Sequence, residues 1–234
     1  MRRRSPLVTE ALLCYNFGNA LYGHDPVFHH LQKERCGMKI GEDKKIKAVI
    51  RKLGRDILVT ESFQSEVNYI QHGEIDCYEH SLAVTYMCVY LARKFRLRVD
   101  LRSVVRGALL HDYFLYDWHD DVAWHRLHGY HHARTSLITA CKDFPMNRTE
   151  KQIIFRHMFP LNISRFPNSK EAALVCMADK ICATIETVHR KRYDPIIYEG
   201  LRLPVEVPMS DLRGRRPSIL RRDEIKCLTQ AQEK

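Results

Sequence analysis

A histidine and an aspartate stand side by side at the end of an apolar stretch of this sequence. The stretch runs from Val104 to Leu110, and His111 and Asp112 follow it directly. An unpaired buried carboxylate costs on the order of several kcal/mol, so a core helix that ends in this pair needs a partner for the carboxylate. A divalent metal ion is a partner for both side chains. The pair therefore indicates a metal site, although a single His-Asp dipeptide is common by chance.

Two more chemically active residues occupy positions that face a core. Apolar residues follow His80 at helical spacing from Val84 to Leu91, which places His80 on the buried stripe of its helix. Asp179 shares a helical face with Ala183, and an aspartate on a buried face is rarely without a partner. A lone histidine on such a stripe is more often a core residue bonded to a carbonyl. The metal interpretation therefore depends on the set of residues.

Further histidines lie between these positions. His128, His131 and His132 open an apolar-periodic stretch, and His157 ends the stretch that starts at Ile153. Several helices that each present a histidine or an aspartate inward in one chain favour a shared metal site over separate core histidines.

The order of these residues resembles the HD-domain superfamily of metal-dependent phosphohydrolases. The resemblance covers about residues 60–190, and it implies an all-α fold, the HD-domain helical bundle, here with a loosely structured N-terminal arm and C-terminal tail. It also implies two groups of ligands. The first metal would be bound by His80, His111, Asp112 and Asp179, and the second by His132 and His157 with Asp112 bridging.

The identity of the third histidine ligand stays open. His132 matches the position in the family best, but the next residue is Ala133 where a proline is usual, so His128 and His131 are alternatives. The surrounding sequence, including Gln71-His72-Gly73, resembles a bacterial subfamily of HD-domain proteins without an assigned substrate.

Four imidazoles and two carboxylates form a nitrogen-rich site. Such a site suits one or two divalent transition metal ions, Fe, Mn, Co, Ni or Zn, rather than Ca. The motif has no thiolates nearby, which argues against a structural zinc cage. Two ions bridged by Asp112 and a hydroxide would activate water at neutral pH and hold a phosphate in line.

A phosphate substrate also needs positive or proton-donating partners. The candidates for substrate binding are Lys180, Arg134, Arg106, His128 and His131. Lys180 directly follows the expected ligand Asp179, so we expect it, with Asp112, to have a catalytic role. The two arginines have the alternative of pairing with acidic residues on helix surfaces. His128 or His131 could protonate a leaving group if it is not a ligand.

Three functions compete. The favoured one is a phosphomonoesterase or phosphodiesterase that acts on a nucleotide or another small phosphate. The second is an HD-type diiron oxygenase of a small alcohol or phosphonate, which uses the same six ligands. The third is a non-catalytic metal- or nucleotide-binding regulator, and a complete ligand set argues against it.

The composition predicts one globular domain with appendages, since 234 residues are enough to bury a core. The eight cysteines form no C-x-x-C pair, and Cys88, Cys176 and Cys182 fall in apolar helical stretches as small core residues. No run reaches the roughly 18 apolar residues of a membrane helix, and no apolar signal region follows the arginine-rich start. We therefore expect a cytoplasmic protein without a membrane partner.

The formal net charge of +10 raises the question of nucleic-acid binding. The arginines concentrate in the terminal segments, and Lys44 to Arg55 form a cluster on one charged helix. No ordered alternation of aromatic and basic residues suggests a base-stacking surface. Solvated basic segments are the favoured interpretation, and a small phosphorylated substrate is favoured over nucleic acid as the partner.

The periodicity divides the chain into an N-terminal arm (1–40), a helical core (41–195) and a basic, proline-containing tail (196–234). The predicted helices span 42–57, 62–71, 77–95, 101–111, 133–141, 149–158 and 169–191. Thr149 with Gln152 would cap the sixth, and residues 112–131 would form the loop over the site. Leu203–Val207 is the one strand-like stretch, which its prolines weaken. Gly107 indicates close helix packing beside the site.

Overall fold

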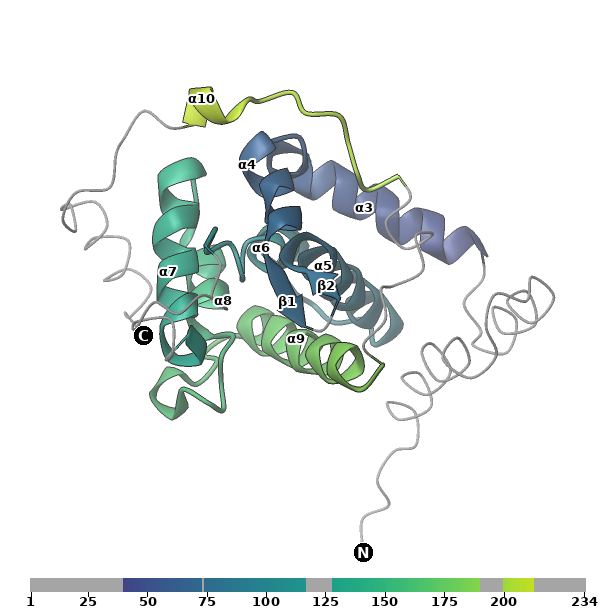
Figure 1. Ribbon diagram of the computed structural model, residues 1–234. Helices are drawn as coiled ribbons and strands as arrows, with labels where there is room; N and C mark the ends of the chain where they lie inside the picture. The colour runs from purple at the N-terminus through teal and green to yellow at the C-terminus, as the bar shows by residue number, and fades with distance from the viewer. Residues whose placement is uncertain (1–39, 73, 117–127, 190–199, 213–234) are drawn as a thin grey trace, which may run out of the picture. The chain divides into compact units, whose positions relative to one another are not determined.

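The computed structural model describes residues 40–72, 74–116, 128–189 and 200–212 (Figure 1). The predicted N-terminal arm, most of the predicted loop over the site and the end of the predicted tail lie outside these residues. The chain divides into two compact units, 1–48 and 49–234, with the boundary inside the first described helix. All of the candidate site residues lie in the second unit.

The all-α prediction is confirmed. The described elements are α3 (Ile40–Leu58), α4 (Glu61–Gln64), η1 (Ser65–Asn68), β1 (Ile70–His72), β2 (Ile75–Asp76), α5 (Cys77–Lys94), α6 (Leu101–Leu109), α7 (His128–Asp143), α8 (Arg148–Arg156), η3 (Ile163–Arg165), α9 (Lys170–His189) and α10 (Met209–Leu212). The two short strands form one antiparallel pair.

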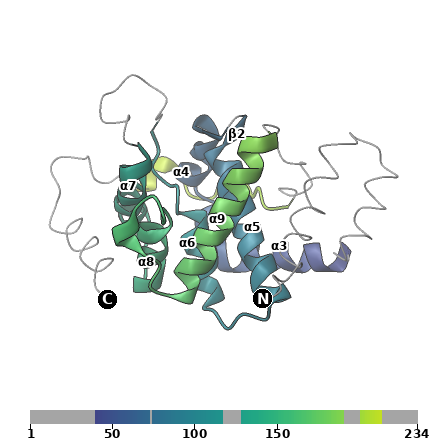
Figure 2. The same ribbon diagram turned by 90° about the horizontal axis from the view of Figure 1, so that it is seen from below.

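Four helices enclose the main core of this unit. α9 crosses α5, with α6 and α8 beside it, and α7 packs on α8 (Figure 2). Val84, Val104 and Val175 are fully buried between these helices. Cys88, Cys176 and Cys182 are buried as predicted, while Cys141 is disulfide-bonded.

The segment between α3 and α5 differs from its prediction. We expected one helix over 62–71, but the chain makes the short α4, tightens into the 3₁₀ turn η1 and then enters β1. The apolar residues Phe63, Val67 and Ile70 are spaced by four and then three positions. This spacing fits a short helical turn followed by a strand as well as it fits one helix. The missed strand matters because it carries Gln71, which contacts the site.

The start of α8 also differs from its prediction. Asn147, and not Thr149, is the N-cap: its side chain accepts a hydrogen bond from the Glu150 backbone N–H at 2.9 Å. The Glu150 carboxylate accepts one from the Asn147 N–H at 3.0 Å, which completes a capping box. The helix dipole also favours a negative charge in the first turn. Glu150 supplies this charge, whereas the neutral side chain of Gln152 does not.

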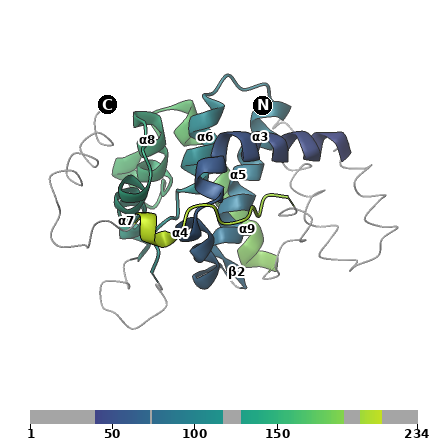
Figure 3. The same cartoon turned by 90° about the horizontal axis from the view of Figure 1, so that it is seen from above.

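Residues 200–212 run past the last turns of α3 and then past α4, and they end in α10 (Figure 3). The backbone N–H of Glu61 donates to the Val207 carbonyl at 2.9 Å, and that of Glu206 donates to the Val59 carbonyl at 2.8 Å. The strand expected over Leu203–Val207 is reduced to one isolated bridge at Val207. This first part of the predicted tail is therefore bound to the helical core rather than loose.

Gly107 sets the distance between α6 and α8. A Cβ atom at this position would lie 2.8 Å from both Cδ1 and Cγ2 of Ile153, closer than van der Waals contact allows. We expect Gly107→Ala to destabilise the fold by about 1–3 kcal/mol through overpacking. Urea denaturation of the parent and the variant measures this difference.

The matched test is a double-mutant cycle with Ile153→Ala, which removes both clashing carbon atoms. The double variant should lose less unfolding free energy than the two single variants lose in sum. Strict additivity would mean that the two residues are not in contact.

Candidate metal centre

Five elements bring the six expected ligand side chains together. His80 comes from α5, His111 and Asp112 from the turn after α6, His132 from α7, His157 from the residue after α8, and Asp179 from α9. Each of the six exposes 4% of its surface or less. Two carboxylates at this depth require compensating partners.

One group consists of His80, His111 and Asp179. The Nε2 atoms of His80 and His111 are 3.3 Å apart. Asp179 Oδ1 is 3.3 Å from Nε2 of His80 and 3.8 Å from Nε2 of His111. These atoms lie close enough together to be ligands of one metal ion.

The second group consists of Asp112, His132 and His157. The Nε2 atoms of His132 and His157 are 2.9 Å apart. Asp112 Oδ1 is 3.3 Å from His132 Nε2 and 3.4 Å from His157 Nε2. This group could also hold a metal ion.

The Asp112 carboxylate stands between the two groups. Its Oδ1 faces the second group, and its Oδ2 is 3.4 Å from His111 Nε2 and 3.7 Å from His80 Nε2 in the first. One carboxylate thus offers one oxygen to each group, which is the arrangement that a bridging ligand needs.

The ligand spacing fits a first-row transition metal. Atoms about 2.1 Å from such an ion are about 3.0–3.4 Å apart at octahedral or tetrahedral angles. The measured separations within the two groups run from 2.9 to 3.8 Å. A metal ion therefore fits with small adjustments of side chains, and no change of the backbone is needed.

Backbone carbonyls determine the tautomers of two histidines. His111 Nδ1 donates to the Ala108 carbonyl at 2.7 Å, and His157 Nδ1 donates to the Ile154 carbonyl at 2.7 Å. A carbonyl can only accept, so Nδ1 carries the proton, and in the neutral ring Nε2 presents a lone pair. Both lone pairs point into the cluster, where they need a cation or a proton.

Glu186 orients the third inward ring, a role that was not predicted from the sequence. Its carboxylate oxygens lie 2.8 and 3.0 Å from His80 Nδ1. A carboxylate behind a metal-binding histidine holds the ring and raises its basicity. The signal was available, because Glu186 follows Asp179 by two helical turns on the same face of α9.

Gln71 is a second residue whose role was not predicted from the sequence. Its Nε2 donates to Asp112 Oδ2 at 2.5 Å, and its Oε1 accepts from Cys77 Sγ at 3.4 Å. The amide therefore fixes the orientation of the bridging carboxylate from the side of β1. Periodicity could not reveal this contact, because it depends on the strand pairing.

Glu66 is a third residue near this cluster whose role was not predicted from the sequence, and it is a buried acid in the 3₁₀ turn η1. It exposes 1% of its surface, and neither carboxyl oxygen has a hydrogen-bond partner within the described ranges of the chain. Burial, together with the carboxylates of Asp112 and Asp76, raises its pKa well above the usual value. Its surroundings therefore shift Glu66 toward the neutral form.

The electrostatics of the cluster keep Asp112 ionised. Although burial raises the pKa of this carboxyl, the imidazoles of His111, His132 and His157 lower it well below its usual range. Burial lowers the pKa of His157 to about 4, so this ring is neutral at physiological pH. His157 is therefore in the form that binds a metal ion. Burial lowers the pKa of His80 and His111 as well, but the nearby carboxylates outweigh it and raise the pKa of both rings above the usual value.

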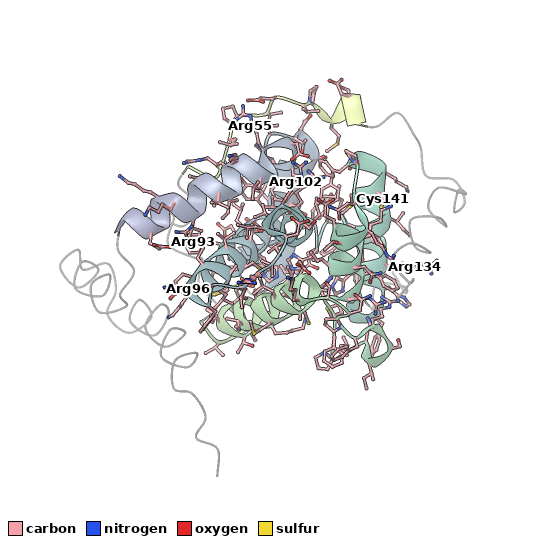
Figure 4. The ribbon with its side chains drawn as sticks, turned by 180° about the vertical axis from the view of Figure 1, so that it is seen from behind. Arg55, Arg93, Arg96, Arg102, Arg134 and Cys141 are labelled. Atoms are coloured by element: carbon pink, nitrogen blue, oxygen red, sulfur yellow. The ribbon has the colours of Figure 1, made fainter. Side chains whose placement is uncertain are left out.

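The candidate substrate residues lie in different places. Lys180 Nζ is 2.7 Å from Asp179 Oδ2, and its side chain is 39% exposed. His131 is exposed on α7, and so is Arg134 (Figure 4). The side chain of His128 lies outside the described residues.

Arg106 takes the alternative role of an ion-pair partner, but in a buried position. Its Nε donates to Glu150 Oε1 at 2.8 Å, its Nη2 donates to the Pro145 carbonyl at 2.8 Å, and its Nη1 pairs with Asp56. The side chain is 2% exposed. A guanidinium occupied in this way joins α6 to the start of α8, so we assign Arg106 to the fold and not to substrate binding.

Comparison with known proteins gives one match. Residues 77–184 match the family model of the HD domain, and all six ligand candidates lie within this range. No curated protein and no solved structure matches the chain. Among the described residues, no helix combines the length and the apolar character that crossing a membrane requires.

The contact between Glu186 and His80 leads to a testable prediction. Glu186→Gln keeps the volume of the side chain but removes the charge behind the ring, so we expect metal affinity to fall about 10- to 100-fold. Competition with a chromophoric chelator measures this. Glu171→Gln is the matched control, because Glu171 is a mostly buried acid on the same helix that accepts from the Asp100 N–H. If both variants bind the metal as tightly as the parent does, Glu186 does not have the assigned role of supporting His80.

Proposed function

Because residues 77–184 of this chain belong to the HD-domain superfamily, we propose that the protein is a metal-dependent phosphohydrolase. Its substrate would be a phosphate ester of a nucleotide or of another small molecule. The observation that carries the proposal is the position of Asp112, which offers one oxygen to each of two histidine-rich groups. We assign His80, His111, Asp112 and Asp179 to the first ion and His132, His157 and Asp112 to the second.

The chain contributes orientation and charge to this chemistry. When bound, divalent transition metals lower the pKa of a coordinated water and neutralise the charge of phosphate oxygens. Asp112 holds the two groups at a fixed separation, and Gln71 keeps its carboxylate from rotating. The backbone carbonyls behind His111 and His157 direct their Nε2 atoms inward, so these two rings already face the cluster before an ion binds.

Lys180 is the described cation best placed to meet the substrate. Its ammonium group bonds the oxygen of Asp179 that does not face the histidines, and more than a third of its side chain is exposed. A phosphate at the exposed side of the cluster would accept a charge-assisted hydrogen bond from it. We therefore assign Lys180 to substrate binding.

The activity assay measures two reactions at once. The protein is incubated with nucleotides, cyclic nucleotides and sugar phosphates in the presence of Mn, Co, Ni, Fe or Zn. We expect release of phosphate, or of a phosphomonoester from a cyclic nucleotide. Oxygen consumption by the iron form with a small alcohol or phosphonate, without phosphate release from any substrate, would contradict the proposal in favour of an oxygenase.

The ligand assignment predicts the metal content of two variants. Asp112→Ala should lose most bound metal and most activity, because Asp112 is assigned to both ions. His132→Ala should keep the first ion and lose the second, which leaves about half the metal of a fully loaded parent. Elemental analysis of the purified variants measures both. Unchanged metal in Asp112→Ala would refute the assignment.

The assignment of Lys180 predicts a separate effect. Lys180→Met keeps the aliphatic stem and removes the charge, so kcat/KM should fall about 10- to 100-fold through the loss of one charge-assisted hydrogen bond. Metal content must be measured in the same preparation, because Lys180 also bonds a proposed ligand. A loss of activity that tracks a loss of metal would instead make Lys180 a residue that positions Asp179.

A further inference from the structure

Three arginines from three elements converge beside the contact between α7 and α8. Arg134 lies on α7, Arg156 is the last residue of α8, and Arg165 is the last residue of η3. Like charges repel, so a cluster of this kind needs an anion or a high exposure to water. None of the metal-centre residues belongs to it.

Arg165 lies over an aromatic ring. Its guanidinium carbon is 4.3 Å from the centroid of the Phe155 ring. A guanidinium in this position makes a cation–π contact with the ring. Its Nη1 is buried and has no hydrogen-bond partner among the described residues. A buried cationic donor without a partner indicates a missing acceptor.

Arg156 is fixed next to this group. It exposes 9% of its surface, and its Nη1 donates to the Phe166 carbonyl at 2.8 Å. Its Nε bonds the side-chain oxygen of Gln152. Both partners are neutral, so the positive charge of Arg156 is not neutralised by them.

Arg134 reaches the same place from α7. It follows Tyr130 by one helical turn, and the Tyr130 carbonyl accepts from Asn162 Nδ2 at 3.4 Å. Asn162 directly precedes η3, so the exposed face of α7 that carries Arg134 lies next to the 3₁₀ turn that carries Arg165. Arg134 itself is exposed and can move toward a ligand.

The positive charges of Arg134 and Arg156 act on Arg165. Burial lowers the pKa of Arg165, and the neighbouring Arg134 and Arg156 lower it further. Within the described part of the chain, none of the three forms an ion pair with a carboxylate. The cluster is therefore a concentration of positive charge without internal compensation.

We propose that Arg134, Arg156 and Arg165 form a binding site for a phosphate group, separate from the metal centre. A phosphate presents several strong acceptor oxygens to the planar forks of arginine, and each contact is charge-assisted. The group can come from a small phosphorylated molecule or from a nucleic-acid backbone, which share this chemistry. The site does not depend on the proposed hydrolase activity.

Isothermal titration calorimetry of the full chain tests the site with two probes, inorganic phosphate and a single-stranded DNA decamer without terminal phosphates. We expect the parent to bind at least one of them. Arg165→Gln and Arg134→Gln should each weaken that binding about 10-fold or more. Arg134 is exposed, so its variant tests the site even if Arg165→Gln does not fold.

Two control variants test whether the binding belongs to this cluster. Arg96→Gln removes an exposed arginine far from Arg134 in the fold (Figure 4) and should change neither affinity. Asp112→Asn disables the proposed metal centre and should keep the binding. The proposal is overturned if the parent binds neither probe, if both cluster variants bind like the parent, or if Asp112→Asn alone loses the binding.

Discussion

The buried carboxylate of Asp112 is the constraint on which this structure depends. It is 2% exposed, and burial alone would favour its neutral form. Imidazoles on both sides keep it ionised, and Gln71 donates to one of its oxygens. Removing the partners of such a buried charge costs about 3–5 kcal/mol, so the neighbouring helix ends must deliver those partners accurately.

The packing of α6 on α8 explains how the ends of these helices place the partners of Asp112. The missing side chain of Gly107 lets Ile153 approach α6, and Arg106 joins α6 to the capping box of α8 through Glu150. The two helices that end at the site are therefore held together along their length. In each, a carbonyl of the last turn then accepts from the Nδ1 of the histidine three residues later. Residues of the fold that never touch a metal thus set the direction of its ligands.

The sequence predicted most of the helices, and the inward positions of His80 and Asp179, because these features leave a local signal. A histidine or aspartate on an apolar stripe is visible from its neighbours alone, as with His80 and Asp179. The roles of Gln71 and Glu66 depend on how distant segments pack, and no local pattern encodes that. The same reason explains Arg106: helical spacing shows that a residue lies among apolar neighbours, but not that acidic residues of two other helices reach it.

Anomalous diffraction from crystals of the metal-loaded protein tests the bridging role of Asp112 most directly, because it locates ions independently of activity. We predict a peak among His80, His111, Asp179 and the facing oxygen of Asp112. With both ions bound, a second peak lies on the other side of the Asp112 carboxylate, about 3.5–4 Å from the first. At saturating metal, the absence of any peak beside Asp112, or peaks confined to other parts of the chain, would contradict this assignment.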